Sequence, residues 1–314
     1  MNRRTFVTSG AGVGAGLLLA GCTGQSGDDE GESTETTEES GSDETTEETT
    51  TEASEETTAE ASEETTAEDS ADYEVEEPVV IGSDIPYNPF EYRTEDGTLV
   101  GFDVDVAEAV FAEEMGLEYE FEQTGFDTII PSLNNGNFRL IMSAMTINDE
   151  RAQQVDFSEP YFTAYQTVAV LENGDIESLD DLQGQTVAVQ KGTTGEAATE
   201  ELQSEFDGDL SIDSYDQISG AFNALLNGQA AAVINDNTVN AQYVSERDSV
   251  VFLEGEGEAA DQGDDAPDYL TLTVEEYGIA FRQDDDAFRQ AVDEALAAVR
   301  ESGRYDEIYA EYFE

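Results

Sequence analysis

Residues 101–107 read Gly101-Phe102-Asp103-Val104-Asp105-Val106-Ala107, and they begin the segment that decides the fold. Val104, Ala107 and Phe111 recur at the i, i+3, i+7 spacing of one face of an amphipathic helix. The apolar run Val79-Val80-Ile81 lies upstream and is short enough for a buried strand. A strand followed by an amphipathic helix favours an α/β fold.

Short apolar runs and amphipathic stretches alternate along the rest of the chain. Strands are expected at 140–142, 167–171, 186–189, 231–234 and 277–281. Helical periodicity is expected near 218–226, 288–299 and 308–313, with Gly228 and Gly303 suited to helix ends. This alternation predicts the α/β class. The acidic, Gly-rich stretch 254–268 predicts a surface loop.

The charge composition is strongly acidic. The 314 residues include 75 Asp and Glu but only 11 Lys and Arg, for a formal net charge of −64, and Lys191 is the single lysine. This argues against a nucleic-acid partner, because phosphate binding needs a basic surface. Such a chain repels itself in dilute buffer, whereas a Debye length of about 3 Å at 1 M salt screens the repulsion. The composition therefore predicts adaptation to concentrated salt. A calcium-binding protein is the alternative, but the sequence lacks the acidic D-x-[DN]-x-[DN]-G loop.

Residues 1–22 are expected to be an export signal. Arg3-Arg4 precedes a Gly-rich apolar stretch that is too short for a transmembrane helix, and paired arginines in this place resemble a twin-arginine signal. Leu19-Ala20-Gly21-Cys22 resembles a lipoprotein lipobox, so we expect Cys22 to become the lipid-modified N-terminus. Cys22 is the only cysteine, which excludes an intramolecular disulfide.

Residues 23–77 are expected to form a disordered tether. They are mostly Thr, Glu, Ser, Asp, Ala and Gly, and such a segment cannot bury enough apolar surface to offset its chain entropy. A flexible chain of this length spans on the order of 40 Å. The folded part is then expected at 78–314.

Six segments of this folded part follow one another in a characteristic order: Pro89–Tyr92, Gly101–Ala107, Phe126–Gly136, Met145–Arg151, Asp156–Tyr161 and the tail from Glu276 to Tyr309. In this order they resemble the family 3 solute-binding proteins, which are the polar amino-acid receptors of ABC importers. The resemblance implies a two-lobed periplasmic-binding-protein-like fold of type II, with two crossover segments and a ligand held between the lobes. Lobe 1 would comprise about 78–164 and 280–314, and lobe 2 about 167–277.

Two charged residues match the positions with which this family holds an amino acid. Arg151 matches the carboxylate-binding position, and a guanidinium can grip two oxygens in parallel. Asp236 follows the apolar run 231–234 and matches the aspartate that takes the ammonium group. Ligands of open α/β sheets lie at the carboxyl ends of strands, where Asp236 is expected. The alternative interpretations are that Arg151 is an ordinary surface arginine and that Asp236 is an aspartate without a role in binding.

The Gly-rich turn Gly192-Thr193-Thr194-Gly195 is expected to join a strand to a helix. Its amides and the helix dipole suit an anion such as a carboxylate. Phosphate is the competing ligand, but the Gly-x-x-x-x-Gly-Lys-Ser/Thr pattern is absent from the sequence. The resemblance implies that Thr194 and Gly195 contact the ligand and that Gln190 discriminates between ligands by their side chains. Lys191 is expected at the surface.

The resemblance also implies ligand contacts from lobe 1. Ser143, Ala144 and Thr146 would offer backbone and hydroxyl groups to the charged ends of the ligand. Tyr87 and Phe126 would sandwich its aliphatic part, with core packing as the alternative for both aromatic rings.

Asp84 would meet the distal group of the ligand, with Gln190 opposite. This implies an amide or a cation there, as in glutamine or a basic amino acid; a compatible solute of similar shape is an alternative. An enzyme on the same scaffold, such as a cyclohexadienyl dehydratase, is another. The sequence contains no histidine, and its one cysteine lies in the expected signal, so common catalytic constellations are missing.

We therefore expect no catalytic residue, metal or cofactor. The expected protein is an extracellular, lipid-anchored and monomeric receptor that delivers a free amino acid to an ABC permease and its ATPase. A sensor module is the third class considered, and no signalling region is expected after the last helix.

Overall fold

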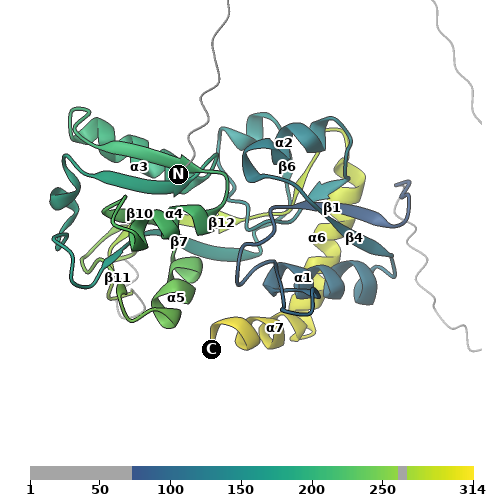
Figure 1. Cartoon of the computed structure of the whole chain (residues 1–314). Helices are drawn as coiled ribbons and strands as arrows, with labels where there is room; N and C mark the ends of the chain where they lie inside the picture. Colours follow the sequence, from purple (N-terminus) through teal and green to yellow (C-terminus); the bar gives the residue numbers. More distant parts are fainter. Residues whose placement is uncertain (1–72, 261–266) are drawn as a thin grey trace, which may run out of the picture. The chain divides into compact units, whose positions relative to one another are not determined.

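Residues 73–260 and 267–314 are described by the computed structural model, and they form two large β-sheets with helices packed around each, together with a small two-stranded sheet (Figure 1). The expected signal, with Arg3, Arg4 and Cys22, and the tether up to residue 72 lie outside the described residues. Tyr73 packs its ring on Phe288, with the ring centroids 5.2 Å apart. Within the described ranges, the helices lack the combined length and apolar character that a membrane span needs.

The first sheet and its helices are here called lobe 1. The strand order is β4-β1-β5-β13-β6. The strands are β1 (Val79–Ser83), β4 (Tyr119–Gln123), β5 (Leu140–Ile141), β6 (Asp156–Phe157) and β13 (Ala280–Phe281). The helices are α1 (Phe102–Ala107), the π-helix η1 (Glu108–Glu114), α2 (Phe126–Asn134), the 3-10 turn η2 (Arg151–Gln153), α6 (Asp286–Glu301) and α7 (Arg304–Phe313). β1 is parallel to β4 and β5, and β13 is antiparallel to β5 and β6. The short strands β2 (Tyr92–Arg93) and β3 (Leu99–Val100) form a separate hairpin.

The second sheet and its helices are here called lobe 2. The strand order is β11-β7-β10-β8-β9, and β12 also pairs with β7. The strands are β7 (Phe162–Leu171), β8 (Thr186–Gln190), β9 (Ser211–Tyr215), β10 (Ala232–Asp236), β11 (Val250–Phe252) and β12 (Thr271–Tyr277). The helices are the 3-10 turn η3 (Leu179–Leu182), α3 (Thr194–Glu205), α4 (Ile218–Leu226) and α5 (Asn237–Glu246). β8 is parallel to β10, so the carboxyl ends of both strands, Gln190 and Asp236, lie at the same edge of the sheet.

Strands β7 and β12 connect the two lobes. They pair antiparallel, with Phe162 opposite Tyr277, and Figure 1 shows them between the lobe that carries α3 and α4 and the lobe that carries α1 and α2. At the lobe 1 end, the amide of Gly278 donates to the carbonyl oxygen of Met145 at 3.0 Å. The expected α/β, two-lobed fold of type II with two crossover segments is confirmed.

Aromatic packing holds this crossover against lobe 1. The ring centroid of Phe90 lies 5.1 Å from that of Phe162 and 5.4 Å from that of Tyr277, both in edge-to-face arrangements. Phe313, on the last helix, lies 4.9 Å from Phe162. Such aromatic pairs stabilise a core beyond their buried area, so the start of β7 and the end of β12 are fixed on lobe 1.

Two expected elements differ from the structure. The single strand expected at 277–281 is divided, because β12 ends at Tyr277 and β13 begins at Ala280 in the other sheet. Gly278 lies at the division, where a side chain would approach the Ile147 side chain to 2.9 Å. The first helix continues as a π-helix, in which the Met115 amide donates to the carbonyl of Val110, five residues earlier. Its buried face therefore departs from the regular helical spacing expected from the sequence.

Candidate functional site

A pocket between the lobes brings together ten of the eleven expected ligand contacts. It is lined by Asp84, Tyr87, Phe126, Ser143, Ala144, Thr146, Arg151, Gln190, Thr194 and Asp236, together with Thr193. Gly195 is not part of the lining. A side chain at Gly195 would lie 2.8 Å from the carbonyl oxygen of Ile234, so glycine here permits the close packing of α3 on β10. The cavity holds about 10 Å³, roughly the space of one water molecule.

Asp236 lies at the carboxyl end of β10, where every residue of the strand is buried. Its Oδ2 accepts a short hydrogen bond from the hydroxyl of Tyr87, and its Oδ1 accepts one from Nε2 of Gln166. Burial raises the pKa of Asp236 to about 7, and the nearby charge of Glu275 adds to the rise; the hydrogen bonds from Tyr87 and Gln166 oppose it. Tyr87 belongs to lobe 1, so this contact crosses the cleft.

Arg151 enters the pocket from η2 of lobe 1. Its Nη1 donates to the carbonyl oxygen of Thr146 at 2.7 Å, and its Nη2 donates to the carbonyl oxygen of Gly192, in lobe 2, at 3.2 Å. The guanidinium carbon lies 5.2 Å from the ring centroid of Phe126, which is a cation–π distance. Burial lowers the pKa of Arg151, while the charges of Glu275 and Asp236 oppose that change. The residue is thus a buried cation held between the two lobes.

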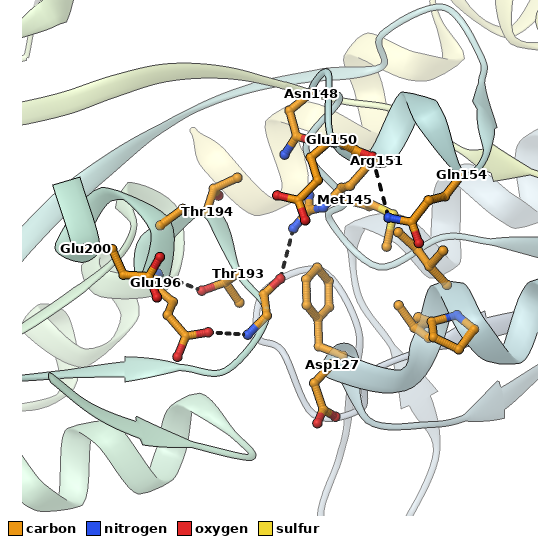
Figure 2. A pocket seen from close by; sticks show the side chains of 16 residues that line it. Asp127, Met145, Asn148, Glu150, Arg151, Gln154, Thr193, Thr194, Glu196 and Glu200 are labelled. Atoms are coloured by element: carbon orange, nitrogen blue, oxygen red, sulfur yellow. Dashed lines mark hydrogen bonds between the residues drawn. The ribbon is translucent and has the colours of Figure 1, made fainter.

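Side chains of the Gly-rich turn and of the first helical turn cap the start of α3. Oγ1 of Thr193 accepts a hydrogen bond from the backbone amide of Glu196 at 3.2 Å. The Glu196 carboxylate in turn accepts a hydrogen bond from the backbone amide of Gly192 at 2.7 Å (Figure 2). The amide of Gly192, expected to be available to an anion, is therefore occupied. Thr194 presents its side chain to the pocket instead.

Asp84 and Gln190 form a further contact across the cleft. Nε2 of Gln190, at the end of β8, donates a short hydrogen bond to Oδ2 of Asp84. Burial raises the pKa of Asp84 to about 6; the bond from Gln190 opposes this shift, and the charge of Asp127 adds to it.

Two buried carboxyl groups, Glu91 and Asp103, support the floor of the pocket. Ser143 Oγ donates to Oε1 of Glu91 at 2.7 Å and accepts the amide of Asp84 at 2.9 Å. The amide of Ala144, whose φ is 45°, donates to Oδ2 of Asp103 at 2.9 Å. This left-handed conformation is strained for a residue other than glycine, so the Asp103 carboxylate stabilises it.

Burial raises the pKa of Asp103 to about 6. Burial also raises the pKa of Glu91 well above its usual range, and the negative charge of Asp103 raises it further. Asp103 belongs to the stretch 101–107 that identified the fold. Sequence reasoning placed it on a helix without recognising its part in the site.

Glu275, on β12, is a further residue of the site that sequence reasoning missed. Its Oε2 accepts hydrogen bonds from Oγ1 of Thr146 at 2.7 Å and from Oγ1 of Thr194 at 2.8 Å. The period-2 alternation of a strand places Glu275 on the same face as the buried Tyr277, and this signal could have distinguished it from the exposed Glu276.

A second cavity of about 340 Å³ adjoins the pocket and shares Phe126, Arg151, Thr193 and Thr194 with it. Figure 2 shows the acidic side chains around this cavity: Asp127, Glu150, Glu196 and Glu200. Lys191 Nζ forms a 2.7 Å ion pair with Asp127 of lobe 1 and is 52% exposed, so the residue expected at the surface also spans the cleft. Over the described ranges, His, Cys, Asp and Glu do not gather in groups of three that could hold a metal ion.

The family assignment follows from comparison with known proteins. The model of the bacterial extracellular solute-binding proteins, family 3, matches residues 79–314. The chain belongs to this family. This family 3 protein is 35% identical over 237 residues to a probable histidine-binding protein of Neisseria gonorrhoeae, covering 74% of this chain and 82% of that protein. It is 31% identical to the ABC transporter glutamine-binding protein GlnH of Bacillus subtilis, covering 69% and 73%.

Solved structures agree with this assignment. An ancestral arginine-binding protein bound to arginine superposes with a TM-score of 0.67 and is 34% identical, covering 75% of this chain and 98% of that one. The ancestral amino acid-binding protein AncCDT-1, a precursor of cyclohexadienyl dehydratase, gives a TM-score of 0.65 at 34% identity, covering 75% and 95%. The relatives are thus amino-acid-binding proteins, several of them from ABC transporters.

Proposed function

We propose that this family 3 protein captures a free polar amino acid between its lobes and delivers it to an ABC permease and its ATPase. The observation that carries the proposal is the convergence of Arg151, from lobe 1, and Asp236, from lobe 2, on one buried pocket. A zwitterion needs a cation and an anion at a fixed separation and away from water, and this pair supplies both.

Arg151 binds the ligand carboxylate, because a guanidinium offers parallel donors to two oxygens. Asp236 binds the ligand ammonium at the end of β10. Tyr87 and Phe126 enclose the aliphatic carbons between these two charges. Ser143, Ala144 and Thr146 of lobe 1 and Thr194 of lobe 2 line the remaining walls. Gly195, which packs closely against Ile234 at the start of α3, contacts the ligand beside Thr194.

Ligand entry requires the lobes to separate. A cavity of about 10 Å³ is too small for an amino acid, and the contacts that close it include Tyr87 with Asp236, Gln190 with Asp84, and Arg151 with Gly192. An amino acid that joins Arg151 to Asp236 replaces some of these contacts and favours closure. The closed form then presents both lobe surfaces to the permease, which couples recognition to delivery.

Asp84 and Gln190 select the distal group of the ligand, so we propose glutamine or a basic amino acid. Asp84, Asp236 and Glu275 are three carboxylates in or beside a pocket with one buried guanidinium. This charge balance favours a ligand with a cationic side chain. A compatible solute of similar size is the alternative, and the ligand panel below includes it.

The proposal extends to the N-terminal residues. Residues 1–22 serve as a twin-arginine lipoprotein signal, Cys22 carries the membrane lipid, and 23–77 tether the binding domain, 78–314, with its lobes at about 78–164 plus 280–314 and 167–277. The composition supports a halophilic source, since 75 acidic residues need screening by concentrated salt. The protein then acts as a monomer on the outer face of the cell membrane.

An enzyme on this scaffold is the second candidate, because AncCDT-1 is described as a precursor of cyclohexadienyl dehydratase. The raised pKa values of Asp84, about 6, and Asp236, about 7, would suit a general acid. We infer binding without catalysis, since both carboxyl groups are already assigned to ligand charges.

Isothermal titration calorimetry at 3 M salt tests the proposal, with the free amino acids, glycine betaine and the substrate of cyclohexadienyl dehydratase as ligands. Binding of a polar amino acid without turnover is the expected result. Turnover of the dehydratase substrate, or binding of betaine alone, would contradict it.

A further inference from the structure

Glu275 occupies a position that links the two lobes across the pocket. The residue is 6% exposed, and its Oε2 accepts hydrogen bonds from Thr146 Oγ1 of lobe 1 at 2.7 Å and from Thr194 Oγ1 of lobe 2 at 2.8 Å. Its Oε1 accepts one from Thr273 Oγ1 at 3.0 Å. One carboxylate oxygen therefore holds a hydroxyl group from each side of the cleft.

The hydrogen bonds from Thr146 and Thr194 to Glu275 occupy the hydroxyl hydrogens that would otherwise be available to a ligand carboxylate. A threonine hydroxyl has a single hydrogen, and a carboxylate can only accept. The hydrogen of Thr194 points to Glu275, while Nε2 of Gln166 donates to the same hydroxyl oxygen at 3.1 Å. Thr146 likewise donates to Glu275. Glu275 and the carboxylate of an incoming amino acid thus compete for the same two donors.

The charge of Glu275 acts in the same direction. Among the charges that counter the lowering of the Arg151 pKa by burial, that of Glu275 is the largest, ahead of Asp236. Arg151 and Glu275 also share a partner, since both form hydrogen bonds with Thr146. A ligand carboxylate that approaches Arg151 therefore meets a like charge nearby, and in a buried site such repulsion is screened poorly by solvent and salt.

We propose that Glu275 is an internal stand-in for the ligand carboxylate: it closes the cleft in the absence of ligand and must give way when an amino acid binds. The inference rests on the proposed function, because it assumes that the natural ligand carries a carboxylate. It predicts that Glu275 weakens the binding of every such ligand, and that it does not weaken the binding of a ligand that lacks a carboxylate.

Glu275→Gln tests the proposal, measured by calorimetry at 3 M salt with arginine, glutamine and agmatine, the amine that arginine becomes without its carboxylate. Arginine or glutamine should bind at least about tenfold more tightly to the variant, equivalent to about 1.4 kcal/mol. Agmatine should show no gain. Glu276→Gln is the matched control, because it removes the same charge from the exposed neighbour on β12 and should bind like the wild type.

An unchanged or weakened affinity for the carboxylate ligands, or an equal gain for agmatine, would overturn the proposal. Small-angle X-ray scattering supplies a readout without ligand: Glu275→Gln should have a larger radius of gyration than the wild type, and equal values would also contradict the idea. Should Glu275→Gln not fold, Glu275→Asp shortens the reach to both hydroxyls and should change both measurements in the same direction. If the wild type and the variants bind no amino acid, the proposed function fails, while scattering still decides whether Glu275 holds the cleft closed.

Discussion

The hydroxyl group of Tyr87 donates a hydrogen bond to the carboxylate of Asp236, 149 residues away in the sequence and on the opposite lobe. The other carboxylate oxygen of Asp236 accepts a hydrogen bond from Nε2 of Gln166, so both oxygens have hydrogen-bond donors within the protein. An amino-acid ammonium group therefore enters a carboxylate site whose geometry is already fixed. This arrangement makes Asp236 the residue whose ionisation should govern binding.

Arg151→Ala and Asp236→Ala should each abolish tight ligand binding. Each change leaves one end of the zwitterion desolvated without its partner, which costs roughly 2–5 kcal/mol, or roughly 30-fold to several thousandfold in affinity. Calorimetry with the ligand found for the wild type measures the loss. Arg93→Ala removes an exposed arginine and serves as the control; a wild-type affinity in Arg151→Ala would contradict the proposed mechanism.

Ligand affinity should fall as the pH is lowered through about 7. In the ligand-free protein the pKa of Asp236 is raised to about 7, chiefly by burial, so this carboxyl group is increasingly protonated below that pH. Binding of an ammonium group requires the ionised form, so the proton must be released at a cost in free energy. Calorimetry from pH 5 to 8.5 should show the change. Asp236→Asn should bind weakly and show a flatter profile; an equally steep profile in that variant would assign the effect to another group.

The ligand-free protein should be more stable at pH 5 than at pH 8. The pKa values of Asp84 and Asp103 are raised to about 6 and that of Asp236 to about 7, mainly by burial, against about 3.9 in an unfolded chain. Between pH ~4 and ~7 the native state thus binds more protons than the unfolded state, so the free energy of unfolding falls as the pH rises. Thermal unfolding at 3 M salt measures this, and Asp236→Asn should reduce the difference. A higher melting temperature at pH 8 would contradict the burial argument.

Folding should require concentrated salt. At 0.1 M salt the Debye length is about 10 Å, so the repulsion among 75 acidic residues is screened far less than at molar concentrations. Near-UV and far-UV circular dichroism at 3 M and 0.1 M salt should show loss of structure on dilution. Spectra that remain the same at both concentrations would argue against salt adaptation.

Membrane attachment should depend on Cys22. Cys22→Ser should release the protein into the medium, because an acidic tether has no attraction for an anionic membrane surface. Fractionation after a high-salt wash measures the release, and retention of the variant on the membrane would refute lipid anchoring. Changing both Arg3 and Arg4 to lysine should block export; normal secretion would argue against the twin-arginine route.

Much of the site could be predicted because its residues occur in short segments with a fixed order. Met145–Arg151 supplied Thr146 and Arg151, and the ends of the expected strands supplied Gln190 and Asp236. Gly195 is not part of the pocket lining, and its close approach to the carbonyl oxygen of Ile234 was not predicted, because it depends on how α3 packs on β10. Its contact with the ligand stays a prediction. The division of 277–281 between two sheets also depends on contacts with lobe 1.

The sequence by itself determined the α/β class, several of the buried strands and amphipathic helices, the acidic character and the polar residues at the strand ends. These follow from local periodicity and composition, which each segment carries alone. Only the tertiary structure decided that Glu275 reaches Thr146 and Thr194, that Glu91 and Asp103 lie buried beneath Ser143 and Ala144, and that the pKa of Asp236 is raised. Burial and hydrogen bonding between residues that are distant in sequence arise when the two lobes pack, because the free energy of a charge depends on everything that surrounds it.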